Sequence, residues 1–79
     1  MTLLHRRDPL TNLARFYAVT IERSLFDEFV LVRLWGRIGT HGRRRSEAFP
    51  SEAEAMSASD HIVQTKRRRG YSEPSQIDE

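Results

Sequence analysis

The chain has 79 residues, with 13 Lys and Arg against 11 Asp and Glu, and a domain of this length buries only about 60% of the surface that its unfolded chain exposes. We therefore expect a single domain without a deep, enclosed active site. The absence of cysteine excludes disulfides, thiolate metal sites and cysteine nucleophiles, and no apolar run approaches the roughly 20 residues of a membrane span.

The positive charge is concentrated in the first 71 residues. Residues 72–79 carry three acids (Glu73, Asp78 and Glu79) and no base, so residues 1–71 hold 13 basic against 8 acidic residues. A basic domain attracts polyanions, nucleic acid before an anionic membrane surface, although a basic surface can also serve solubility alone. Because the N-terminus lacks the apolar stretch of a signal peptide, we expect a soluble cytoplasmic protein.

The first part of the chain shows a change of pattern. Residues 1–12 mix leucines, charged residues and a proline without helical or strand period, which predicts an irregular N-terminal arm. From Ala14 to Arg23 the chain is rich in aromatic and β-branched residues, which predicts a first strand. Residues 24–28 then predict a reverse turn into the next strand.

The longest apolar-rich run, Phe29–Arg37, predicts the central strand and holds the only tryptophan. One face of this strand is aliphatic and readily buried, and consists of Val30, Val32 and Leu34. The other face carries Trp35 between the guanidinium groups of Arg33 and Arg37. Because burying such charges is costly, we expect Trp35 to be displayed. The alternative is that Trp35 closes a second small core, with the arginine stems lying along it.

Glycines mark the end of this strand. Gly36 lies within it, where glycine indicates a bulge, a bend or an unusually close neighbour. Residues 39–42 predict a hairpin tip. Three consecutive arginines, Arg43–Arg45, then open a third strand that ends near Phe49. Since they follow the turn directly, we expect them to lie close to Trp35.

A helix begins after Pro50. Ser51 and Glu54 have the spacing of a capping box. A modest apolar stripe follows at helical spacing and consists of Ala55, Met56, Ser59, Ile62, Val63 and Lys66. The helix ends in a basic last turn before Gly70, and residues 72–79 predict an acidic, flexible tail. The predicted fold class is therefore α+β, a small twisted antiparallel sheet covered by one C-terminal helix.

Aromatic and basic side chains converge at one end of the predicted sheet. A flat ring can stack on an exposed base or sugar, and arginine forks bind phosphate oxygens with two hydrogen bonds each. The candidate nucleic-acid-binding residues are Trp35, Arg33, Arg37, Arg43, Arg44 and Arg45. A secondary basic patch, which can equally be a solvated helix end that responds to the helix dipole, consists of Lys66, Arg67, Arg68 and Arg69.

No pattern typical of an enzyme stands out. His5, His41 and His61 are scattered and lack a second ligand at metal spacing. No Ser-His-acid order, Gly-rich phosphate loop or paired carboxylate is recognisable. We therefore expect no catalytic residue, no metal, no cofactor and no small-molecule substrate.

The rival class is a protein-interaction adaptor. Aromatic and arginine side chains are also enriched at protein interfaces, so the same face could dock on a partner protein or on a second copy of the chain. Membrane attachment is not expected, because the helix lacks the bulky apolar face that lies in a lipid surface.

The order of these residues resembles the WGR domain, a module named for its Trp-Gly-Arg tripeptide and found in poly(ADP-ribose) polymerases and in stand-alone bacterial proteins. The resemblance places the domain at residues 13–71. It rests on Ala14–Tyr17, Leu25 and Phe26, Leu31–Gly39 and Lys66–Tyr71.

The resemblance implies an antiparallel sheet packed by one helix and a protein that binds DNA at ends or nicks. In the polymerases, the motif tryptophan packs on the sugar at the end of a strand and the motif arginine makes polar contacts beside it. These roles fall on Trp35 and Arg37. The catalytic domain of the polymerases has no counterpart in these 79 residues, so a non-enzymatic module is expected.

Overall fold

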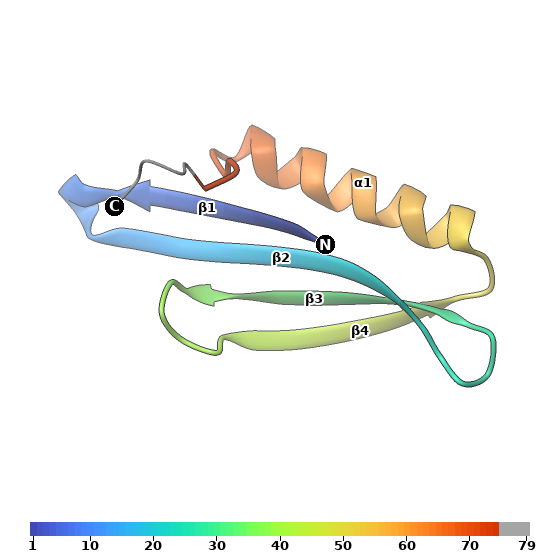
Figure 1. Cartoon of the computed structure of the whole chain (residues 1–79). Helices are drawn as coiled ribbons and strands as arrows, with labels where there is room; N and C mark the ends of the chain where they lie inside the picture. The colour runs from blue at the N-terminus through green and yellow to red at the C-terminus, as the bar shows by residue number, and fades with distance from the viewer. Residues whose placement is uncertain (75–79) are drawn as a thin grey trace.

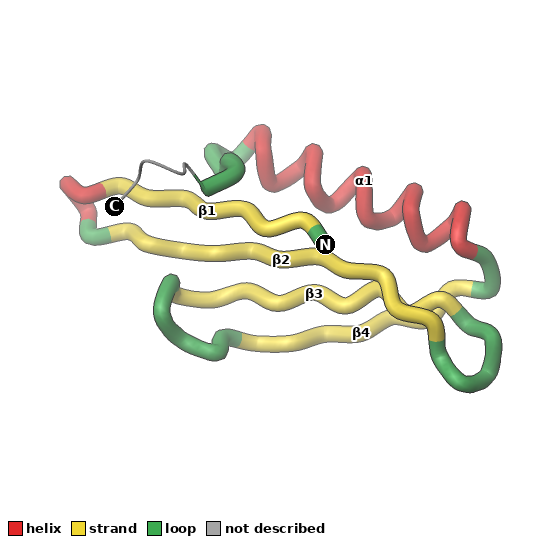
Figure 2. The backbone as a smooth tube through the Cα atoms, viewed as in Figure 1, coloured by secondary structure: helices red, strands yellow, loops and turns green. Residues whose placement is uncertain are grey.

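The computed structural model describes residues 1–74, which form a four-stranded antiparallel sheet and one α-helix (Figure 1). In spatial order, the strands are β1 (Thr2–Asp8), β2 (Leu13–Arg23), β3 (Phe29–Arg37) and β4 (Arg43–Phe49). A 3-10 turn, η1 (Pro9–Thr11), joins β1 to β2, and α1 (Glu52–Arg68) runs along one face of the sheet (Figure 2). The predicted α+β class is confirmed.

The N-terminal segment is a strand, and the prediction of an irregular arm over residues 1–12 is wrong. β1 pairs with β2 along its whole length, and Leu4 is fully buried. Charged residues around Leu4 hid the strand period in the sequence. Such charges are common in edge strands because they discourage pairing with other chains.

The predicted acidic tail, residues 72–79, begins on the sheet. His5 of β1 donates its N–H to the carbonyl of Ser72 at 2.7 Å, and Ser72 donates its N–H to the carbonyl of His5 at 2.9 Å. This bridge covers part of the outer edge of β1. Residues 75–79 lie outside the described part of the chain.

α1 covers the face of the sheet that carries Leu31 and Trp35. The sequence favoured burial of the other, aliphatic face of β3, where Val32 is fully buried and Val30 and Leu34 are half-buried. The core cluster consists of Leu4, Tyr17, Val19, Leu31 and Tyr71, against which pack Ile21, Trp35, Phe49, Ala58, Ile62 and Val63. The expected cost of burying arginine falls on Arg33 alone, which is half-buried, because Arg37 stays exposed at the end of β3.

Both ends of α1 are capped. Ser51 Oγ accepts the N–H of Glu54 at 3.2 Å and donates to the carboxylate of the same residue at 2.9 Å. At the other end, Gly70 adopts a φ of 95°, and Tyr71 donates its N–H to the carbonyl of Lys66 at 3.1 Å. This arrangement is a Schellman motif. It turns the chain back so that Tyr71 enters the core.

Two glycines allow the β3–β4 turn to cross closely over the end of β3. A Cβ on Gly36 would lie 2.8 Å from the Cα of Gly42, and a Cβ on Gly42 would overlap the carbonyl oxygen of Trp35. Phe16 pairs with Gly36, and its ring packs beside the crossing. The register of β2 and β3 continues through Gly36 without a bulge. Gly36 is therefore needed because it lets the β3–β4 turn lie close to the end of β3.

Alanine at position 42 is expected to destabilise the fold more than alanine at position 39. Both glycines have a positive φ, 70° at Gly42 and 93° at Gly39, so either substitution costs about 1–2 kcal/mol. Only at Gly42 would the new methyl group also meet a backbone carbonyl and the ring of Phe16, which adds about 1–3 kcal/mol. Urea unfolding of the two variants measures the difference, and equal losses would contradict the close crossing.

Candidate nucleic-acid interface

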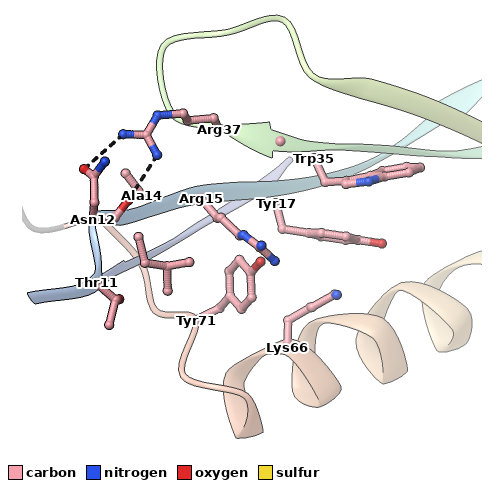
Figure 3. Close-up of a pocket in the computed structure, with 11 residues that line it drawn as sticks. Thr11, Asn12, Ala14, Arg15, Tyr17, Trp35, Arg37, Lys66 and Tyr71 are labelled. Atoms are coloured by element: carbon pink, nitrogen blue, oxygen red, sulfur yellow. Dashed lines mark hydrogen bonds between the residues drawn. The ribbon is translucent and has the colours of Figure 1, made fainter. Parts of the chain in front are cut away.

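An open cleft lies at the end of the molecule where β2 begins and where β3 and α1 end (Figure 3). Its volume is about 590 Å³. Residues 11–14 supply part of its lining, and the side chains that give it its chemistry are Arg15, Tyr17, Trp35, Arg37, Lys66 and Tyr71. We call it the aromatic cleft.

Two stacked rings form one wall of the aromatic cleft. Tyr17 and Trp35 are directly opposite in the register of β2 and β3, with ring centroids 6.1 Å apart and planes inclined by 22°. Tyr71 meets Tyr17 edge-on, with centroids 6.4 Å apart. Trp35 is half-buried, since it packs against the core cluster and also lines the cleft. The structure thus combines the two interpretations of Trp35, display and a place beside the core.

The ammonium of Lys66 lies over two tyrosine rings, 4.6 Å from the centroid of Tyr17 and 5.5 Å from that of Tyr71. Partial burial lowers the pKa of Lys66 below its usual value of 10.5, and three neighbouring guanidinium groups lower it further. In decreasing order of effect they belong to Arg69, Arg33 and Arg15. Within residues 1–74, no ion pair joins Lys66 to a carboxylate. The cleft therefore gathers positive charge, and no acid of residues 1–74 forms an ion pair with its Lys66.

Arg37 is tied to the connection between η1 and β2. Its Nη1 donates to the backbone carbonyl of Asn12 at 3.2 Å and its Nη2 to the side-chain Oδ1 of Asn12 at 3.3 Å (Figure 3). Arg15 lies opposite Arg37 in the register of β2 and β3, is exposed and lines the cleft. Arg15 was not among the candidate residues predicted from the sequence. Its position two residues before Tyr17, on the same face of β2, was the available signal.

The three consecutive arginines of β4 diverge. Arg43 and Arg45 lie on the α1 side of the sheet, and Arg43 is directly opposite Trp35. Arg44 lies on the other side, opposite Leu34. All three are exposed. The strand alternation therefore separates Arg44 from the two arginines that share the face of Trp35.

The remaining predicted residues are dispersed. Arg33 shares the face of Trp35, and its buried Nε has no hydrogen-bond partner among the described residues. Lys66 was predicted to belong to the secondary basic patch, but in the structure it lines the aromatic cleft. Arg67 forms a 2.7 Å ion pair with Glu73. The other two members of the patch, Arg68 and Arg69, are exposed.

The described residues contain no group of three or more His, Asp or Glu side chains that could hold a metal ion. Within the same part of the chain, no helix has the length and apolar character needed to cross a membrane.

Comparison with known proteins gives two matches. A family model described as the WGR domain matches residues 1–78. The uncharacterized protein y4dW of Sinorhizobium fredii (strain NBRC 101917 / NGR234) is 43% identical over 68 residues, which cover 86% of this chain and 33% of that protein. The chain therefore spans about a third of the length of this curated relative. No solved structure matches the chain significantly.

Removal of the charge of Arg69 is expected to raise the pKa of Lys66 without restoring the value of 10.5, because burial is the larger cause of the shift. The NMR titration of the Lys66 side chain in Arg69→Gln measures this change. Arg68→Gln, which removes a neighbouring exposed charge that is not among the causes of the Lys66 shift, is the control. A full return to 10.5 in Arg69→Gln would contradict the role of burial.

Proposed function

Because this chain belongs to the WGR domain family, a family of nucleic-acid-binding modules, we propose that the aromatic cleft binds DNA at the end of a strand, at a break or a nick. The observation that carries this proposal is the stacked pair of Tyr17 and Trp35 in an open cleft that also holds Lys66 and Arg15. The WGR domain is a non-catalytic module, so the role proposed for the cleft is recognition.

Strand ends suit the cleft for a geometric reason. Inside an intact duplex every base and sugar is flanked by neighbours, whereas the last nucleotide of a strand exposes one side. The indole of Trp35 can pack against that side, and stacking of an aromatic ring on a base contributes about 1–3 kcal/mol. Tyr17 stacks on Trp35 with ring centroids 6.1 Å apart and holds the indole in place before DNA arrives. Such pre-organisation lowers the entropy lost on binding.

The cations of the cleft would neutralise the phosphates next to that end. Lys66 acts as a point charge, and Arg15 can bind a phosphate with two parallel hydrogen bonds. Arg37 uses two of its N–H groups on Asn12, which leaves three of its five donors for DNA. Arg37 can therefore fix the η1–β2 connection and contact DNA at the same time.

Arg43 and Arg45 extend the basic surface from Trp35 along β4. Phosphates farther from the strand end would reach these exposed side chains. Together with Arg15 and Lys66, they give four phosphate contacts in the proposed complex, in which Arg37 makes polar contacts beside the terminal sugar instead.

A nicked duplex is expected to bind more tightly than an intact closed circle, because only the nick offers a strand end to Trp35. Four phosphate contacts predict a loss of affinity of about 150-fold between about 50 mM and about 200 mM salt. Titration of a labelled nicked duplex, with the closed circle as competitor, measures both effects. Equal binding of the two DNAs would refute end recognition. Binding that hardly responds to salt would favour the rival role as a protein-interaction adaptor.

The alternation of β4 gives a matched test of which arginines contact DNA. Arg43→Gln combined with Arg45→Gln is expected to reduce the slope of log affinity against log salt by about 2, whereas Arg44→Gln leaves the slope unchanged. All three side chains are exposed, so the fold should keep its stability. Salt titrations of the three proteins on the nicked duplex measure the slopes. A larger effect of Arg44→Gln would place the DNA on the opposite face of the sheet.

A further inference from the structure

The loop between β2 and β3 displays two large apolar side chains to solvent. Leu25 is 99% exposed and Phe26 is 83% exposed. The loop lies at the end of the sheet where β2 ends and β3 begins, opposite the end that holds the aromatic cleft (Figure 1). Single exposed apolar residues are common, but two neighbours at the tip of a hairpin form a small apolar knob.

This knob is held in a fixed conformation. The hydroxyl of Ser24 accepts the N–H of Phe26 at 3.1 Å and the N–H of Glu28 at 3.2 Å. The N–H of Ser24 donates in turn to the carbonyl of Glu28 at 2.8 Å. Asp27 adopts a φ of 60°. Its Oδ1 forms an ion pair with Nη2 of Arg23 at 3.2 Å. The loop therefore presents Leu25 and Phe26 in a defined arrangement, which favours their insertion into a complementary surface.

The charge around the knob restricts what can bind it. Residues 22–28 contain three acids, Glu22, Asp27 and Glu28, and one base, Arg23. Arg23 is paired with Asp27, and its Cζ lies 5.6 Å from the centroid of the Phe29 ring. An acidic, apolar knob is repelled by nucleic acid and by an anionic membrane. It fits a partner surface that combines apolar or aromatic walls with positive charge.

The opposite end of the same chain has this chemistry, and we propose that the knob of one copy docks in the aromatic cleft of a second copy. Leu25 and Phe26 would pack against the wall formed by Tyr17 and Trp35, and Asp27 and Glu28 would approach Lys66 and Arg15. The molecule is 45 Å long, so the two surfaces on one copy cannot meet. The contact is head-to-tail and generates open chains or closed rings.

Head-to-tail docking competes with DNA if the cleft is the DNA site, but it does not depend on that function. The knob is remote from the cleft, so substitutions in the knob remove self-association and leave the proposed DNA contacts in place. Failure of either proposal is thus distinguishable from failure of the other.

Two variants with complementary defects test the contact. Leu25→Ser combined with Phe26→Ser removes the knob, and Arg15→Glu combined with Lys66→Gln changes the cleft. Thermal melts establish that each variant is folded. If the cleft variant does not fold, Arg15→Glu alone replaces it, since Arg15 is exposed. Met56→Gln, which removes another exposed apolar side chain on α1, is the matched control.

Sedimentation velocity at low salt, up to about 1 mM protein, measures the association, since a contact with a Kd of 1 mM is then substantially populated. The unmodified chain and Met56→Gln are expected to form oligomers that dissociate at high salt. Each complementary variant alone should be monomeric, and an equimolar mixture of the two should form a dimer, because each supplies the surface that the other lacks. An unmodified chain that stays monomeric would overturn the proposal, as would a knob variant that still associates or a mixture that remains monomeric.

Discussion

The stack of Tyr17 on Trp35 is the contact on which both the core and the cleft depend. The two residues face each other across β2 and β3, so their contact is fixed by the strand register and by the tight turn after β3. One side of the pair packs on the core cluster, and the other side is a wall of the aromatic cleft. The same interaction therefore stabilises the sheet and shapes the surface that is available to a ligand.

The Trp-Gly-Arg tripeptide performs three different tasks at consecutive positions. Trp35 supplies the stacked ring, and Gly36 leaves room for the β3–β4 turn to cross at Gly42. Arg37 reaches away from the turn and holds Asn12 through two hydrogen bonds. The end of β3 and the η1–β2 connection are thereby held together at the cleft. A conservative change at any one of these positions would alter the position of a neighbour as well as the residue itself.

The elements that the sequence predicts correctly are those that depend on interactions between residues close together in the chain. The bounds of β3 and the Schellman end of α1 arise from local patterns, and the structure agrees with both. β1 was missed because its strand character comes from pairing with β2, which its own composition does not reveal. Arg15 and Lys66 are 51 positions apart in the sequence and line the same cleft because α1 packs on the face of the sheet that carries Tyr17. The alternation of β2 indicates that Arg15 shares a face with Tyr17, but the approach of Lys66 to that face has no signal in a single sequence.

The same long-range placement explains why the cleft is suited to an anion before any ligand is bound. Folding brings Lys66 close to Arg15, Arg33 and Arg69, and both burial and repulsion lower the pKa of Lys66. An anion in the cleft would reduce the repulsion on Lys66, whereas a neutral ligand would not. The folded protein thus holds these positive charges close together before any ligand binds, and charge that is pre-organised in this way favours negatively charged partners over neutral ones.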